Sequence, residues 1–183
     1  MPSANTNNSL TIRLATEADI PAMHALMDVA IAELLKPFLG AAEVKASFEI
    51  MGIDTQLIRD QTYFAVEESG VIVGCGGWSR RATLYGGDHT NGRDAALLDP
   101  ATDAARVRAM YTHPNHTRRG IGRLVLETCE DAARKESFTR VQLAATMAGV
   151  PLYRACGYES IEEIMSQTST GVDVPLIRMG KAV

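Results

Sequence analysis

The sequence of 183 residues predicts one α/β domain of the α+β type, with a mixed, mostly antiparallel sheet of about seven strands and helices on both faces. Three observations support this prediction. Two strand-like segments, 106–112 and 140–146, enclose an amphipathic helical segment, and this order gives a central parallel strand–helix–strand unit. Before that unit, apolar runs joined by turn residues at 62–79 predict an antiparallel hairpin. After it, a short helical segment at 149–156 precedes two further strands.

The N-terminal third predicts one strand and two helical stretches. Residues 10–15 alternate between apolar and polar side chains, which is the period of a strand with one buried face. Apolar residues then recur every three or four positions over 20–36, and Pro37 ends that helix. A second helical pattern covers 43–60 but is interrupted at Gly52.

The middle of the chain contains a long segment without periodicity. Residues 80–105 form it, and a loop of this length is uncommon unless it is functional or mobile, so we interpret it as an insertion. In the strand that follows, simple alternation predicts that Val107, Ala109 and Tyr111 share one face, opposite Arg108.

Composition excludes several classes of protein. A net charge of -4 is not typical of a nucleic-acid binder, and the apolar stretches are too short to span a membrane. Three widely spaced cysteines fit neither a disulfide framework nor a zinc site, so no metal is predicted. Residues 1–9 have neither a basic start nor an apolar run, which predicts a flexible tail on a cytoplasmic protein.

Glycine and positive charge are concentrated just before the central helix. The first turn of a helix carries N–H groups without intrahelical partners and a partial positive charge, so it attracts anions. Gly120 and Gly122 leave the main chain accessible, and Arg118, Arg119 and Arg123 add full charges. A pyrophosphate fits this arrangement best.

Two other phosphate-binding motifs do not fit this glycine loop. The P-loop of nucleotide hydrolases requires Gly-x-x-x-x-Gly-Lys-Ser/Thr, which the chain lacks, and the dinucleotide fingerprint fails because Val125 stands at its third glycine. A basic first turn without any ligand remains an alternative. A nucleotide-binding or redox protein also stays open.

The segment "RAMYTHPNHTRRGIGRLVLETCEDAARK", followed by "VQLAATMAGVPLYRACGYES", resembles the GNAT superfamily of acyl-coenzyme-A-dependent N-acetyltransferases. In that family a strand ending in His-Pro leads to R/Q-x-x-G-x-G/A, a helix, a strand, Leu-Tyr and Gly-Phe/Tyr. The resemblance is detailed over 106–160. The first strand, its helix and the hairpin also fall where the family has them, so the whole chain reads as one GNAT-like domain.

The resemblance implies acetyl-CoA as co-substrate and a set of residues that bind it. These are Met110, Tyr111 and Thr112 along the pantetheine arm, and Arg118, Arg119, Gly120, Ile121, Gly122 and Arg123 around the pyrophosphate. It also implies that Tyr153 lies near the coenzyme sulfur and protonates the departing thiolate. A phenol is protonated at neutral pH, which suits this role, although a tyrosine that only packs in the core is the alternative.

The general base is not assigned by the sequence. Where some family members place a carboxylate, this chain has Arg106, and Thr117 replaces the preferred Gln or Arg of the loop. Glu67, Asp103 and His113 are candidates, and a base acting through ordered water is equally compatible. A catalytically inactive acyl-CoA-binding sensor or interaction module is therefore the alternative to an enzyme.

The acceptor is expected to be an amine, either of a small molecule or of a peptide or protein. Trp78, Arg80 and Arg81 end the hairpin that should border the acceptor side, and we expect 80–105 to shape or gate the acceptor pocket. A mobile surface loop is the alternative. An exposed sheet edge formed by the last strands would support a homodimer.

Overall fold

The computed structural model describes residues 9–183, so most of the expected N-terminal tail lies outside the described residues. Seven strands form a single sheet in the order β1-β2-β3-β4-β5-β7-β6. Only β4 and β5 pair in parallel, and every other neighbouring pair is antiparallel, which confirms the predicted fold. The strands are β1 (Thr11–Leu14), β2 (Tyr63–Glu68), β3 (Val71–Ser79), β4 (Ala105–Thr112), β5 (Arg140–Thr146), β6 (Glu159–Ser166) and β7 (Val174–Ala182). The α-helices are α1 (Ile20–Leu34), α2 (Ala41–Ile50), α3 (Thr55–Arg59), α4 (Ile121–Lys135) and α5 (Val150–Ala155), and two 3-10 turns are η1 (Glu17–Asp19) and η2 (Pro114–His116).

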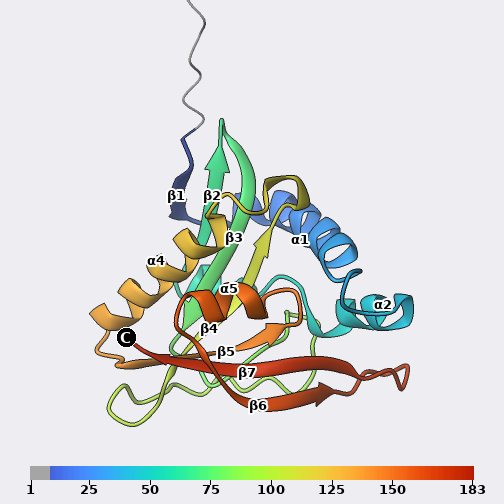
Figure 1. Ribbon diagram of the computed structural model, residues 1–183. Coiled ribbons are helices and arrows are strands. Elements are labelled where there is room, and N and C mark those ends of the chain that lie inside the picture. The colour runs from blue at the N-terminus through green and yellow to red at the C-terminus, as the bar shows by residue number, and fades with distance from the viewer. Residues whose placement is uncertain (1–8) are drawn as a thin grey trace, which may run out of the picture.

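Helices cover both faces of the sheet, as Figure 1 shows with α4 on one side and α1 on the other. The side chains of α4 and the inner residues of β4 and β5 form one buried cluster, which includes Val107 and Leu143. The side chains of α1 and α3 form a second cluster with the opposite face of β2 and β3. None of the helices within residues 9–183 combines the length and the apolar character needed to cross a membrane.

The parallel strands separate soon after they meet. β4 and β5 are in register only at Ala105–Val141 and Arg106–Gln142, and Figure 1 shows them diverging beyond that point. On its other side, β4 keeps pairing with β3 as far as Thr112. Within the described chain, the remaining edge of β4 that faces β5 therefore has no strand partner, and its main-chain groups are available to a ligand.

A β-bulge in β4 overturns the predicted alternation of faces. Two residue steps in β3, from Gly77 to Cys75, match three steps in β4, from Arg108 to Tyr111. The extra residue, Ala109, has a φ of 51°, and its carbonyl accepts a hydrogen bond of 3.1 Å from the buried Tyr63 hydroxyl. As a result Val107 packs in the α4 cluster whereas Tyr111 packs in the α1 cluster. The prediction that they share a face is wrong because an extra residue reverses the pleat.

The helical pattern predicted over 43–60 is two helices, α2 and α3, separated where Gly52 interrupts the pattern. Gly52 has a φ of 143°, a conformation that side chains with a Cβ rarely adopt. The break turns Asp54 into the N-cap of α3, where its carboxylate accepts from the Gln56 amide at 3.1 Å.

The segment between β3 and β4 covers residues 80–104, which we call the long loop, and it is tied to the helices beneath it. Arg81 donates twice to Asp60, at 2.7 and 2.9 Å, and Arg93 pairs with Asp54 at 3.0 Å. An isolated bridge joins Arg81 to Leu97 within the loop. These contacts argue against the alternative of a freely mobile surface loop.

The end of the hairpin lies elsewhere than expected. Trp78 is buried in the α4 cluster, where its ring meets Phe138 edge-on at 6.1 Å. Arg80 lies over the Trp78 ring and forms an ion pair with Glu136. Trp78 and Arg80 therefore pack against the residues that follow α4, and not against α1 or α3.

Candidate functional site

The gap between β4 and β5 opens into a cavity of about 650 Å³, which we call the large cavity. Its walls come from α1, β4, the loop before α4, the first turn of α4, and α5. Most of the residues expected from the sequence line it, namely Met110, Tyr111, Thr112, Arg118, Gly120, Ile121, Gly122, Arg123 and Tyr153. The structure thus brings the strand end, the glycine loop and the tyrosine together around one hollow.

The first turn of α4 faces the large cavity with unpartnered main-chain donors. The Gly120 N-cap has no side-chain hydrogen bond within the described chain, so the amides of the first helical turn are free to bind a ligand. Gly120 has a φ of 81° and Arg118 a φ of 64°, so the chain turns through the left-handed region twice before the helix begins. Successive amides in such a turn form an anion-binding concavity.

The two glycines of the loop have different roles. A Cβ at Gly120 would meet no atom within 4 Å, so its left-handed conformation is the reason for glycine there. A Cβ at Gly122 would lie 2.6 Å from Leu152 Cδ2, so glycine allows α4 and α5 to pack closely. The sequence suggests that both glycines are present to keep the main chain accessible. For Gly122 a second reason is the close packing of α4 on α5, which form two walls of the large cavity.

Of the three arginines expected around the pyrophosphate, Arg118 and Arg123 line the large cavity. The Arg119 guanidinium instead forms two hydrogen bonds with Glu68 at the end of β2. The same carboxylate lies 3.3 Å from His116 Nε2, and Arg119 holds the pKa of Glu68 below its usual value. His116 is one of the residues that line the large cavity. Within the described chain, its buried Nδ1 has no hydrogen-bond partner.

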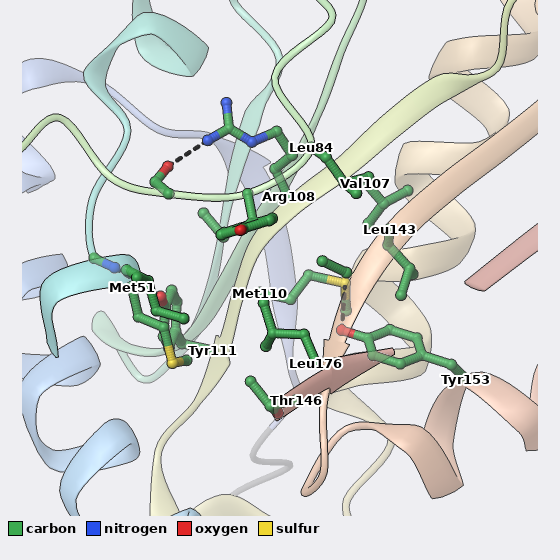
Figure 2. Close-up of a pocket in the computed structure, with 16 residues that line it drawn as sticks. Met51, Leu84, Val107, Arg108, Met110, Tyr111, Leu143, Thr146, Tyr153 and Leu176 are labelled. Carbon is green, nitrogen blue, oxygen red and sulfur yellow. Dashed lines mark hydrogen bonds between the residues drawn. The ribbon is translucent and has the colours of Figure 1, made fainter. Parts of the chain in front are cut away.

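Tyr153 lies where the large cavity meets a second hollow. The ring is buried, and Gly149 makes room for it, since a Cβ there would lie 2.7 Å from Tyr153 Cε2. The hydroxyl points toward Met110 Sδ at 3.7 Å, as the dashed line in Figure 2 shows. Burial raises the pKa of Tyr153 above its ordinary value of about 10. The phenol is therefore protonated throughout the neutral range and available as a proton donor.

The second hollow, which we call the small cavity, has a volume of about 90 Å³ and is drawn in Figure 2. Its walls come from residues 50–52 after α2, residues 84–86 of the long loop, and β4 from Val107 to Tyr111, with apolar side chains from β5 and β7. The Tyr111 hydroxyl is held by the Gly52 amide at 2.9 Å. Tyr153 and Arg108 lie at opposite ends of the hollow in Figure 2.

Arg108 is the charged group of this hollow. Its guanidinium bonds to the fully buried Asp54 and to the Gly86 carbonyl of the long loop. Asp54 is shared with Arg93, so a single carboxylate joins β4, α3 and the loop. Burial lowers the pKa of Arg108, and the charge of Asp54 opposes this, so that the guanidinium remains protonated at neutral pH.

The three expected candidates for a general base have other partners. Glu67 accepts from Arg13 at 3.1 Å, Asp103 accepts from the Asp99 amide at 2.8 Å, and His113 caps η2 by accepting from the Asn115 amide at 3.1 Å. Among the described residues, none of the three lines either cavity. The small cavity, as far as residues 9–183 form it, has no carboxylate or imidazole in its wall.

Comparison with protein families matches residues 28–158 to a model described as the acetyltransferase (GNAT) family. The chain belongs to this family. Most of the domain is covered by the match, including β4, the glycine loop and Tyr153. The GNAT assignment agrees with the resemblance found in the sequence, whereas comparison with curated proteins finds no match.

Solved structures similar to this GNAT domain cover nearly the whole chain. A GCN5-related N-acetyltransferase from Rhodopseudomonas palustris has a TM-score of 0.71 at 14% identity, covering 96% of each chain. The PaiA N-acetyltransferase from Thermoplasma acidophilum, in complex with coenzyme A, has a TM-score of 0.65 at 11% identity, covering 96% of this chain and 99% of that one. The ribosomal-protein-S18-alanine N-acetyltransferase from Escherichia coli has a TM-score of 0.59 at 17% identity, covering 96% and 94%. At these identities the likeness shows the fold alone.

The network around Arg108 on the acceptor side is not predicted by the sequence. Alternation places Arg108 on a strand face without a role, and Asp54 falls in the interruption of a helical pattern. One signal is present in the sequence: Arg108 lies at the centre of a predicted strand, and a charged residue there is rarely buried unless it is paired. Its partner is not readable, because 54 residues separate Arg108 from Asp54.

Proposed function

We propose that the protein transfers an acetyl group from acetyl-CoA to a primary amine by direct attack, with Tyr153 as the proton donor to the departing sulfur. The observation that supports this most is that Tyr153 lines both cavities, of which the large one also contains the first turn of α4. A donor held in the large cavity and an acceptor held in the small cavity would meet beside this tyrosine.

The donor fits residues that are already in place. First-turn amides of α4, with Arg118 and Arg123 beside them, are suited to the diphosphate. The unpaired edge of β4 near Met110 and Thr112 is suited to the amides of the pantetheine arm. When bound, acetyl-CoA supplies an acetyl group activated as a thioester. This arrangement leaves the sulfur close to α5 and Tyr153.

The residues of the chain then act on protons and orientation. A neutral amine in the small cavity attacks the carbonyl carbon, the N–C bond forms, and the C–S bond breaks. The Tyr153 hydroxyl gives its proton to the sulfur. The amine releases one proton to water, and the tyrosinate regains a proton from solvent. Because no carboxylate or imidazole lines the small cavity within the described chain, water is the proposed route for the proton of the amine.

The same absence favours a second candidate, an acyl-CoA-binding module without catalysis. A thiol-release assay with acetyl-CoA and a panel of amines separates the two. An enzyme releases coenzyme A thiol in proportion to acetylated amine. Raised thermal stability with acetyl-CoA, without turnover across the panel, supports the module, and no stabilisation by acetyl-CoA contradicts both.

The proposal also covers the class of acceptor and the formation of a homodimer. Small-molecule amines and peptide or protein amines both fit an acyl transfer of this kind. β6 forms an exposed sheet edge at which a second copy would pair to give a homodimer. Analytical ultracentrifugation tests the dimer.

A further inference from the structure

Arg108, in the wall of the small cavity, carries a buried donor that has no partner among the described residues. Arg108 is 6% exposed, and its two terminal nitrogens bond to Asp54 and to the Gly86 carbonyl. Its Nε is buried and has no hydrogen-bond partner within residues 9–183. A buried N–H without a partner costs free energy, so such a group in a cavity wall calls for an acceptor atom from a ligand.

The charges around Arg108 favour an oxygen atom and disfavour a second ammonium group. Asp54, the partner of Arg108, faces away and does not line the small cavity. Arg93 bonds to the other carboxylate oxygen of Asp54 at 3.0 Å, and its guanidinium also lies 3.6 Å from Asp88. A diamine would therefore place its distal cation against a guanidinium, with no carboxylate in the described wall to receive it.

The absence of a general base from the described wall of the small cavity restricts the acceptor in a second way, through the protonation state of its amine. Without a carboxylate or imidazole in the wall, the amine has to arrive neutral. At pH 7.5, about a third of α-amino groups with a pKa near 7.8 is neutral, against roughly one in a thousand lysine-type amines with a pKa near 10.4. An amine next to a carbonyl group therefore suits this cavity better than an alkylamine.

We propose that Arg108 selects acceptors that carry an α-amino carbonyl group, in which the amine and the carbonyl are attached to the same carbon, by donating its free Nε–H to the carbonyl oxygen. This inference rests on the proposed function and names its substrate class. The amine nitrogen lies toward Tyr153 and the oxygen toward Arg108, along the length of the hollow in Figure 2.

The test compares matched amines in wild type and in two arginine variants. Glycinamide, glycine and triglycine carry the group, whereas ethylamine and 1,3-diaminopropane do not. Arg108→Met removes the Nε donor and leaves Asp54 paired with Arg93. Arg93→Gln is the control, because it leaves Asp54 paired with Arg108 and removes no donor from the cavity. The pKa of each amine is the same in every assay. A change in the ratio of rates between wild type and a variant therefore reports the effect of the substituted side chain alone.

Wild type is expected to prefer glycinamide to ethylamine, and Arg108→Met to lose about tenfold or more of that ratio, as for a hydrogen bond from a charged group. Arg93→Gln keeps the ratio. If glycinamide and triglycine are acetylated faster than glycine, the natural acceptor is a peptide N-terminus. If glycine is acetylated faster, the acceptor is a free amino acid. A ratio unchanged in folded Arg108→Met, or a wild-type preference for 1,3-diaminopropane, overturns the inference while leaving the transferase intact.

A second measurement does not depend on turnover. Calorimetric titration of the coenzyme A complex with N-acetylglycinamide and with N-ethylacetamide compares product binding, and the first should bind about tenfold more tightly in wild type only. Equal binding of the two contradicts the role of Arg108 even if no amine is acetylated. Should Arg108→Met fail to fold, Arg108→Lys keeps the charge and removes the planar Nε donor.

Discussion

The large and the small cavity are built from different parts of the chain. The large cavity takes most of its polar groups, main-chain amides among them, from one continuous segment that runs from the end of β4 to the first turn of α4. The small cavity takes its polar groups from side chains of distant segments, above all Arg108, which is held through Asp54 of α3 and Gly86 of the long loop. A binding site made mainly by one continuous segment can be read from the local sequence. A site made by side chains of distant segments depends on tertiary contacts.

Tyr153 stands between the two cavities, and its substitution is expected to have the largest effect. Tyr153→Phe should lower kcat by about 100-fold or more, the usual loss when a general acid is removed. Its hydroxyl makes only a long contact to Met110 Sδ, so acetyl-CoA affinity and stability should change little. Stopped-flow thiol release and calorimetric titration measure the two quantities.

Tyr158→Phe is the matched control, because this buried phenol donates to Glu130 at 3.1 Å and lines neither cavity among the described residues, although its ring lies 5.9 Å from that of Tyr153. It should lower stability and leave kcat nearly unchanged. Equal rates for Tyr153→Phe and wild type would remove Tyr153 from the mechanism.

The pH profile of kcat offers a second view of Tyr153. Its raised pKa means that the phenol loses its proton only above about pH 10, so the rate should show no descending limb from this group at lower pH. A Tyr153-dependent decline between about pH 8 and 9 would contradict a buried, protonated phenol.

Gly120→Ala tests the main-chain character of the large cavity. Alanine at a φ of 81° costs about 1–2 kcal/mol, and we expect acetyl-CoA affinity to fall about tenfold as the first amides shift. Gly92→Ala is the control, since Gly92 has a φ of 76°, equally open surroundings and a place outside the large cavity. Both variants should lower Tm by a similar few degrees, and only the first should weaken binding. Identical affinities would show that these amides do not hold the donor.

Gly122→Ala tests the packing of α4 on α5 and is expected to have a smaller effect. Overpacking against Leu152 should cost about 1 kcal/mol, or roughly fivefold in acetyl-CoA affinity. Adding Leu152→Ala gives the new methyl group room and should recover part of the loss. No recovery in the double variant would mean that Gly122 serves the ligand directly.

The smallest effect is expected on the acceptor side, at the ion pair that ties the long loop to α3. Arg81 holds the pKa of Asp60 below its usual value of about 3.9, so the pair contributes fully above that value and is lost as the pH falls through the lowered pKa. Asp60→Asn should remove about 0.5–1 kcal/mol at pH 7 and flatten the loss of stability that the wild type shows as the pH falls below about 4. Thermal unfolding of both proteins at several pH values measures this loss. If the stability of wild type and of Asp60→Asn falls in parallel with pH, the ion pair does not contribute as described.

The features that could be predicted from the sequence are those whose physics is local. The positions of the strands, the glycine loop and the tyrosine of α5 are all readable, because each depends on residues close together in the chain, whereas the bulge that reverses the faces of β4 is not. The turn of Arg119 onto Glu68 is not, since it depends on β2 lying beside the loop. Nor is the pairing of Arg108 with Asp54, because two buried charges far apart in sequence meet only when the sheet and α3 are in place.

The bulge in β4 absorbs one extra residue without changing the sides on which its neighbours lie. Arg108 and Tyr111 pair with Gly77 and Cys75, which are two residues apart in β3, so both lie on one side of the sheet although three positions separate them. Deleting Ala109 would keep that arrangement of sides but would remove the left-handed residue whose carbonyl accepts from the Tyr63 hydroxyl. Because Ala109 also lines the small cavity, a loss of one codon at this point would reshape the wall of that cavity while the loop that starts α4 kept its own sequence.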